Sequence, residues 1–462
     1  MVARSDGDGS PDPDTPSQRP SPACREPGGH NAGTMNRNAG DADTHVATLG
    51  NGVRVVAIAL PQLETASVSV FVRTGSSHES KRESGISHFV EHMAFKGTHE
   101  RSCQQINLDA ERLGADVNAH TDKDHTAYHM RGRARDAASF VRMLGDIVQN
   151  STFPEAELER ERQVLLQEYI EDDEEPLSTA YKMFDKLCFG EHPLAQPVIG
   201  SRTNIRRFTR DDLLGYVQSQ YSGANVVVGV AGRIEDVDRI VLAAEAAFGA
   251  MPAGRENAVP PVHYAGGIAS RALSGSAQTH LVFGLPIPAL GDDAHHAGVV
   301  AAALFGEGMS SPLLDEIRER RGLAYYVSCS ADVGELAGQF VIEASTAPEH
   351  VDELLVEVRR LLVVQAEAVD PVALERAGNQ IAVRRLRAAE RPSRRLEDAA
   401  LDLLALGRVR SRAELVERVT AVTADDVREA FACMLAWRES VAIAGKVKKG
   451  TLERARELFA RR

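Results

Sequence analysis

The chain has 462 residues, of which 43% are apolar and 26% are charged, the composition of a folded globular protein with two or three domains. Its 53 basic and 66 acidic side chains give a formal charge of −13, which argues against a general affinity for nucleic acid or for acidic membranes. No run approaches the roughly 18 apolar residues of a membrane helix, no apolar secretory core begins the chain, and five scattered cysteines lack a Cys-x-x-Cys pair, so we expect a cytoplasmic protein with reduced thiols.

Residues 1–43 are rich in proline, glycine, serine and aspartate and carry almost no large apolar side chains, so they cannot offset the entropy cost of ordering. We expect a disordered N-terminal extension there. The folded part should begin with a strand over 44–49, the two-residue hairpin signal Asn51-Gly52, and a second strand over 53–60. Valines that alternate with polar residues over 67–73 predict a third strand.

The next segment predicts a helix that carries two histidines and a glutamate on one face. Apolar residues recur at helical spacing over 86–93, between a Ser-Gly pair and Gly97. Residues three and four apart share a helix face, so His88, Glu91 and His92 should converge. Two neutral imidazoles suit zinc, which in catalytic sites also needs a third protein ligand and an open position for water. The third ligand must come from elsewhere in the chain.

A candidate third ligand lies in a predicted helix over 155–172, which Pro154 is placed to open. Glu161 and Glu168 stand seven residues apart on one face, so one carboxylate would complete the ligand set and the other would orient a ligand from behind. Glu91 is then free to take a proton from a zinc-bound water. Two histidines and one carboxylate also suit non-heme iron, but Glu91 has a role in hydrolysis and none in oxygen activation, so zinc is preferred.

Three histidines crowd the region that follows. Its strands near 116–131 stand between two further predicted helices, over 103–113 and 136–150. We expect alternation along the strands to send His120, His125 and His129 to different faces, which argues against a second metal site. They are interpreted as strand residues, with His120 a candidate lining residue of the cleft.

The chain repeats itself at a period of about one domain. A threonine that precedes an acidic first helical turn occurs at Thr209 and again at Thr423, and a buried strand ending at glycine follows each. Where the first copy has its paired histidines, the second has only apolar and small residues, over 297–305, so one metal ion per chain is expected. We predict an α+β fold of two tandem homologous domains, each a mainly antiparallel sheet packed with helices, over 44–250 and 264–462, joined by a Pro/Gly-rich linker over 251–263.

The order His-x-x-Glu-His inverts the commoner His-Glu-x-x-His pattern of zinc peptidases. Residues 85–98 around it closely resemble the signature stretch of the pitrilysin and insulinase-like zinc peptidases, the inverzincins. Residues 118–121 resemble the family's substrate-pairing edge strand, and segments 309–313 and 317–325 resemble a further shared region. The resemblance runs from about residue 45 to about residue 448. It is greatest to the two-domain branch that includes the mitochondrial processing peptidase beta subunit and bacterial processing-type peptidases.

This resemblance implies roles for individual residues. In the family the third ligand is a glutamate about 76 residues beyond the second histidine, and Glu168 stands at that separation from His92. Glu161 matches a supporting family glutamate seven residues upstream. The expected substrate-binding residues are Asn118, Ala119, His120, Arg318 and Tyr325. Without the resemblance, the last two would be interpreted as a surface arginine and a core tyrosine.

The resemblance also implies a zinc-dependent endopeptidase, with one Zn²⁺ per chain, that cleaves short or unfolded polypeptides bound as an added strand inside a clamshell. The clamshell needs two such two-domain units, so a second chain is expected. A homodimer is favoured, because one polypeptide carries both halves of the site, and a heterodimer stays open. The alternative is a non-catalytic scaffold or substrate-holding subunit of a heterodimeric peptidase. Such members usually lose part of the metal motif, which is complete here.

Overall fold

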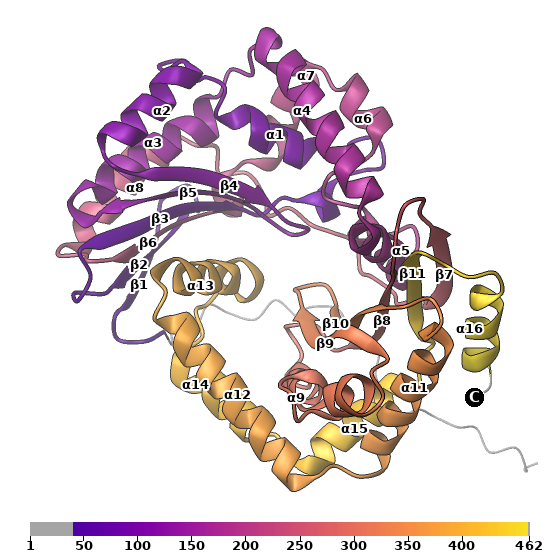
Figure 1. Ribbon diagram of the computed structural model, residues 1–462. Helices are drawn as coiled ribbons and strands as arrows, with labels where there is room; N and C mark the ends of the chain where they lie inside the picture. Colours follow the sequence, from indigo (N-terminus) through magenta and orange to yellow (C-terminus); the bar gives the residue numbers. More distant parts are fainter. Residues whose placement is uncertain (1–39, 461–462) are drawn as a thin grey trace, which may run out of the picture.

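The computed structural model describes residues 40–460 (Figure 1). The expected disordered extension lies outside the described residues up to residue 39. Two aspartates just before the first strand are already held by the second half of the chain. Arg395 Nη1 donates to Asp43 Oδ2 at 2.9 Å, and Arg412 Nε donates to Asp41 Oδ2 at 2.6 Å. Fixed contacts therefore begin a few residues ahead of the predicted start at residue 44.

The first half of the chain forms a six-stranded sheet in the order β1-β2-β6-β3-β5-β4. Its neighbouring strands are antiparallel except for the parallel pair β2–β6. The predicted hairpin joins β1 to β2, and the strands predicted near 116–131 are β4 and β5. The strands are β1 (Thr44–Thr48), β2 (Arg54–Ala59), β3 (Thr65–Val72), β4 (Asp116–Thr121), β5 (Thr126–Arg133) and β6 (Val226–Gly232).

The second half repeats this topology in a five-stranded sheet of order β7-β11-β8-β10-β9. Again one pair, β7–β11, is parallel and the others are antiparallel. The capping threonines of the repeat make the same contacts, because Thr209 forms a capping box with Asp212 and Thr423 forms one with Asp426. The strands are β7 (Gly267–Ala272), β8 (Thr279–Ile287), β9 (Ala324–Val333), β10 (Gly338–Thr346) and β11 (Ser440–Gly445). The predicted α+β fold with two similar, mainly antiparallel sheets is confirmed.

Helices cover one face of each sheet with an apolar core between. In the first half, the alternating valines of β3 meet Phe89 and Phe140, both fully buried. The helices of this half are α1 (Ile86–Ala94), α2 (Cys103–Arg112), α3 (Ala137–Asn150), α4 (Glu155–Glu174), α5 (Pro176–Phe189), α6 (Arg202–Arg207), α7 (Arg210–Gln220) and α8 (Val237–Phe248). Those of the second half are α9 (His295–Gly306), α10 (Pro312–Leu314), the π-helix η6 (Asp315–Arg320), α11 (Val351–Glu367), α12 (Pro371–Ala389), α13 (Pro392–Leu406), α14 (Arg412–Thr420), α15 (Ala424–Leu435) and α16 (Thr451–Ala460).

The other face of each sheet is covered by a helix from the opposite half of the chain. Figure 1 shows α13 against the face of the first sheet that is turned away from α1 and α3, and α5 beside β7 and β11 of the second sheet. Leu396 of α13 sits over Gly229 of β6, where an added Cβ would lie 2.4 Å from the leucine Cδ1. In the same way Phe184 of α5 sits over Gly284 of β8, where an added Cβ would lie 2.5 Å from the ring Cζ. This reciprocal exchange interlocks the two halves.

One expectation about cysteine is corrected. Cys433 is disulfide-bonded, whereas Cys103, Cys188 and Cys329 are free thiols. Sequence spacing gives no measure of the spatial separation that decides pairing, so the bond was not foreseen. Between residues 40 and 460, no helix has the length and apolar character that a membrane span requires.

Candidate metal centre and active site

Helix α1 is fixed at its N-terminus by a buried glutamate. Gly85 caps the helix with φ 98°, and Glu79 accepts hydrogen bonds from the backbone N–H of Gly85 at 2.7 Å and of Ser87 at 2.8 Å. Burial raises the pKa of the Glu79 carboxyl to about 7, although the two amides favour its charged form. The hydroxyl of Ser87 also contacts that of Tyr216 at 2.8 Å. Sequence reasoning missed Glu79, and an acidic residue shortly before a predicted helix start was the available signal.

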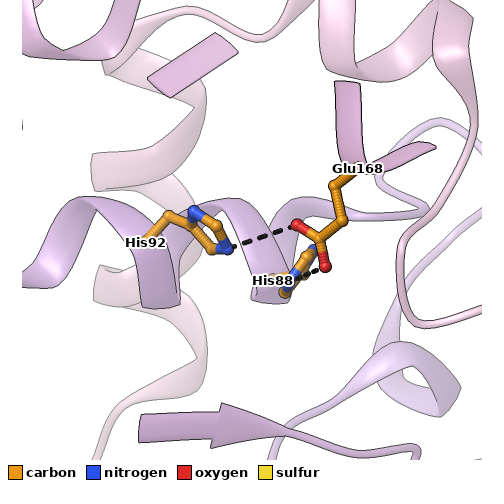
Figure 2. Close-up of side chains that lie close together, drawn as sticks. All are labelled: His88, His92 and Glu168. Atoms are coloured by element: carbon orange, nitrogen blue, oxygen red, sulfur yellow. Dashed lines mark ion pairs between the residues drawn. The ribbon is translucent and has the colours of Figure 1, made fainter. Parts of the chain in front are cut away.

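Three side chains from α1 and α4 converge in front of α1 (Figure 2). His88 Nε2 lies 3.7 Å from Glu168 Oε1, and His92 Nε2 lies 3.7 Å from Glu168 Oε2. One donor atom from each residue falls within 4.8 Å of the other two. Two imidazole nitrogens and a carboxylate oxygen are the donors that zinc takes in catalytic sites, so the residues present fit the expected ion.

The protonation states also fit metal binding. Burial, with the neighbouring His92 ring, lowers the pKa of His88 to about 3, so its imidazole is neutral near pH 7 and its lone pair is available. Burial raises the pKa of Glu168. A bound cation would act against that shift, because it favours the charged carboxylate.

Glu161 lies behind His92, on the side away from Glu168. His92 Nδ1 lies 3.1 Å from Glu161 Oε2, and Lys96 Nζ lies 2.6 Å from Glu161 Oε1. A hydrogen bond from Nδ1 to this carboxylate leaves the Nε2 lone pair of His92 facing Glu168. His88 has no such support, since its buried Nδ1 has no hydrogen-bond partner among residues 40–460. Lys96 was also not foreseen as part of the site.

Glu91 stands on α1 between the two histidines and is held by the neighbouring strand. Thr121 Oγ1, at the end of β4, donates to Glu91 Oε2 at 2.7 Å. Burial raises the pKa of Glu91, while the Thr121 hydrogen bond and the His92 ring act in the opposite direction. A carboxylate with a raised pKa, placed beside the ligands, is suited to accept a proton.

The predicted substrate-pairing segment forms β4, the last strand of its sheet. Within the described chain only β5 pairs with it, which leaves the outer edge of Asn118 and Ala119 unpaired. Thr121 points toward α1 and Glu91. The ring of His120 contacts His125 and His129 instead, on the face that α13 covers.

The expectation that the three histidines lie on different faces is wrong. His125 and His129 are four residues apart and so share a face, and the register that pairs Asn118 with His129 and His120 with Ala127 puts His120 between them. Alternation alone places His125 and His129 on one face, but it cannot place His120 beside them, because the turn between β4 and β5 sets the register of the two strands.

Arg318 and Tyr325 lie in the second half, on η6 and β9. No contact between described residues joins either of them to the His88–His92 site. Tyr325 is 82% exposed, so it is not the core residue that its type alone suggested. Strand β9 ends its sheet as β4 ends the first, and the exposed parts of Arg318 and Tyr325 are accessible to another molecule.

Known protein families match this chain over most of its length. Residues 54–202 match Insulinase (Peptidase family M16), and residues 207–381 match the Peptidase M16 inactive domain. An uncharacterized zinc protease of Rickettsia felis is 32% identical over 386 residues, covering 83% of this chain and 93% of its own. A zinc protease of the same description from Bacillus subtilis, YmxG, is 28% identical over 382 residues, covering 82% and 93%.

Solved structures share the fold. A protease from Helicobacter pylori superposes with a TM-score of 0.79 at 20% identity, covering 87% of this chain and 99% of that one. A chain of complex III from Candida albicans gives the same TM-score at 18% identity, covering 90% and 99%. The family matches span most of the chain, and the zinc-protease relatives cover nearly all of the folded part. The chain therefore belongs to the insulinase family of peptidases, family M16.

Proposed function

We propose that the protein is a zinc-dependent endopeptidase that hydrolyses peptide bonds in short or unfolded polypeptides. The observation that carries the proposal is the convergence of His88, His92 and Glu168 within 4.8 Å, with Glu91 beside them and outside the ligand set. A bound zinc ion would polarise the scissile carbonyl and lower the pKa of a water that it binds to about 7.

The protein's own residues supply the remaining steps. Glu91, held by Thr121, accepts the proton of the attacking water and can pass it to the leaving amine. Glu161 keeps His92 in the tautomer whose Nε2 faces the ligand set. The free edge of β4 offers backbone N–H and C=O groups to an extended peptide, which gives affinity with little sequence preference. Folded proteins cannot present such a strand, so short or unfolded chains are the expected substrates.

We further propose that the active form is a homodimer in which Arg318 and Tyr325 of one protomer reach the metal centre of the other. Their exposure, and the lack of any contact among residues 40–460 between them and this chain's own site, support that arrangement. A heterodimer with a related chain is the alternative. Cleavage by the purified chain alone would support the homodimer, and cleavage only after mixing with a related chain would support the heterodimer.

A second candidate function is a non-catalytic scaffold or substrate-holding subunit. This non-catalytic function stays an alternative because a chain of complex III shares the fold, and the fold alone does not establish peptidase activity. The intact ligand set and Glu91 support the enzyme instead.

The test is metal content by mass spectrometry, together with cleavage of a mixed pool of unfolded peptides before and after chelation. Zinc and chelator-sensitive cleavage are expected. Glu91→Gln should keep zinc and lose hydrolysis, whereas Glu174→Gln, an exposed glutamate at the end of α4, should keep both. Zinc without cleavage by the wild-type chain at any concentration would point to a missing partner chain, and the absence of bound zinc would support the scaffold function. Full activity in Glu91→Gln would contradict the proposed mechanism.

A further inference from the structure

A second group of side chains that could bind a metal ion lies on the face of the first sheet opposite the proposed active site. It joins His120 of β4, His125 of the β4–β5 turn and Glu397 of α13. One donor atom from each residue falls within 4.8 Å of the other two. His125 is 3% exposed, and the side chain of Glu397 is 28% exposed. The proposed peptidase chemistry uses neither His125 nor Glu397.

The two histidines face each other through nitrogens that can bind metal. His120 Nε2 lies 3.2 Å from His125 Nε2. Two nitrogens bound to one tetrahedral zinc ion at about 2.0–2.1 Å would lie roughly 3.3–3.4 Å apart. The observed separation is therefore close to that of two ligands of one ion.

The outer nitrogens of both rings have partners that suit ligating histidines. His125 Nδ1 lies 2.7 Å from Asp124 Oδ1, so a hydrogen bond to this carboxylate would turn the lone pair of His125 Nε2 toward His120. His120 Nδ1 lies 2.9 Å from His129 Nε2, and His129 Nδ1 lies 3.2 Å from Ser69 Oγ. With a proton on each Nδ1, His120 would donate to His129 Nε2 and His129 would donate to Ser69 Oγ. The lone pair of His120 Nε2 would then be free to bind a metal ion.

Glu397 brings the third donor from the other half of the chain. Its carboxylate also pairs with Arg394, at 3.2 Å from Oε2, which leaves the second oxygen for another partner. A metal-free alternative places a proton between the two Nε2 atoms, and that pair alone would satisfy both rings. Such a proton bridge needs no third donor, whereas Glu397 brings a carboxylate oxygen within 4.8 Å of a ring nitrogen of each histidine.

We propose that His120, His125 and Glu397 form a second binding site, for a first-row divalent transition-metal ion of the Zn²⁺ class. Two imidazoles and one carboxylate are its donors, and a water can occupy the fourth position. The ion would clamp α13, from the second half, onto the β4–β5 end of the first sheet. The expectation of one metal ion per chain rested on the single His88–His92 motif and on the argument, corrected above, that His120, His125 and His129 lie on different faces.

The clamp would act on the strand that serves the proposed active site. His120 and Thr121 are neighbours on β4, and Thr121 holds Glu91 on the other side of the sheet. Binding at the second site would therefore restrain β4 and α13 together, and amide hydrogen exchange in both elements should slow when metal is added.

The test separates the two sites by emptying the first. The chain with His88→Ala and His92→Ala is stripped with chelator and titrated with Co²⁺, which is followed by its visible d–d absorption and counted by mass spectrometry. One Co²⁺ per chain is expected. Adding His120→Ala and His125→Ala should abolish this binding, and Glu397→Gln should weaken it at least tenfold. Glu174→Gln, the exposed glutamate at the end of α4, is the control and should leave it unchanged.

The wild-type chain provides a second measurement where a multiple variant does not fold. It should bind two Co²⁺, and Glu397→Gln should bind only one tightly. A folded His88→Ala/His92→Ala chain that binds no Co²⁺, or a bound ion that survives replacement of His120 and His125, would overturn the proposal. A failure of the first site to bind metal or to cleave peptide changes none of these differences, so the two proposals fail separately.

Discussion

Substitutions that remove side-chain volume at Leu396 and add it at Gly229 should show that the two halves of the chain stabilise each other. Leu396 is fully buried among apolar residues of the first sheet, although it belongs to α13 of the second half. Leu396→Ala removes buried carbon atoms and leaves a cavity, which costs about 2–5 kcal/mol in the free energy of unfolding. Leu386→Ala on α12, where the side chain is 56% exposed, is the matched control and should change stability by about 0.5 kcal/mol or less.

Gly229→Ala adds the missing methyl from the other side of the same contact. Its Cβ would lie 2.4 Å from Leu396 Cδ1 and 3.0 Å from Cγ, which forces the leucine or the strand to move at a cost of about 1–3 kcal/mol. In the double variant the obstructing side chain is gone, and the new methyl fills part of the cavity. The double variant should therefore be more stable than the sum of the single effects predicts, by about 1–3 kcal/mol.

The assay is urea unfolding of the four proteins, monitored by circular dichroism, with the free energy of unfolding extrapolated to water. Strict additivity would refute the contact, because two residues that do not touch have no coupling energy. A single cooperative transition for the wild-type chain is also expected, since neither sheet is covered on both faces without the other half. The pair Gly284 and Phe184 offers the same test from the other side of the exchange.

Three further predictions concern the site. Glu161→Gln should weaken zinc binding by about 10–100-fold, because it removes the carboxylate behind His92. Competition with a chelator measures the change in zinc affinity. A zinc affinity equal to that of the control variant Glu174→Gln would contradict this role of Glu161. Burial raises the pKa of Glu79 from 4.5 to about 7, so the folded state holds its proton more tightly than the unfolded state. That contribution to stability is complete below pH 4.5 and is lost as the pH rises through about 7. Glu79→Gln should therefore flatten the pH dependence of the unfolding free energy between these two pH values. An unchanged slope would exclude Glu79 as the source of this pH dependence. If Tyr325 reaches the metal centre of the other protomer as proposed, its hydroxyl can donate a hydrogen bond to the tetrahedral intermediate, so Tyr325→Phe should lower kcat by about 10²-fold. Unchanged steady-state kinetics would remove Tyr325 from the site. Its stability should stay within about 0.5 kcal/mol, because Tyr325 is 82% exposed.

Local patterns in the sequence were enough to predict most elements near the site. The apolar spacing over 86–93 gave helix α1, and the predicted helix over 155–172 agrees with α4 at Glu155–Glu174. The repeated threonine caps predicted two similar halves, and both capping boxes are present. Each of these features depends on residues a few positions apart, where backbone geometry fixes the spatial relation.

The sequence by itself determined which side chains share a face of one helix, and so it placed His88, Glu91 and His92 together. Only the tertiary structure decided what lies opposite each face. The exchange of α5 and α13, the buried Glu79 beneath α1 and the cluster of His120, His125 and Glu397 all join residues whose relative positions depend on turns, strand register or helix packing. Periodicity identifies a buried surface without naming its partner, because apolar burial is non-directional and many partners would satisfy it equally.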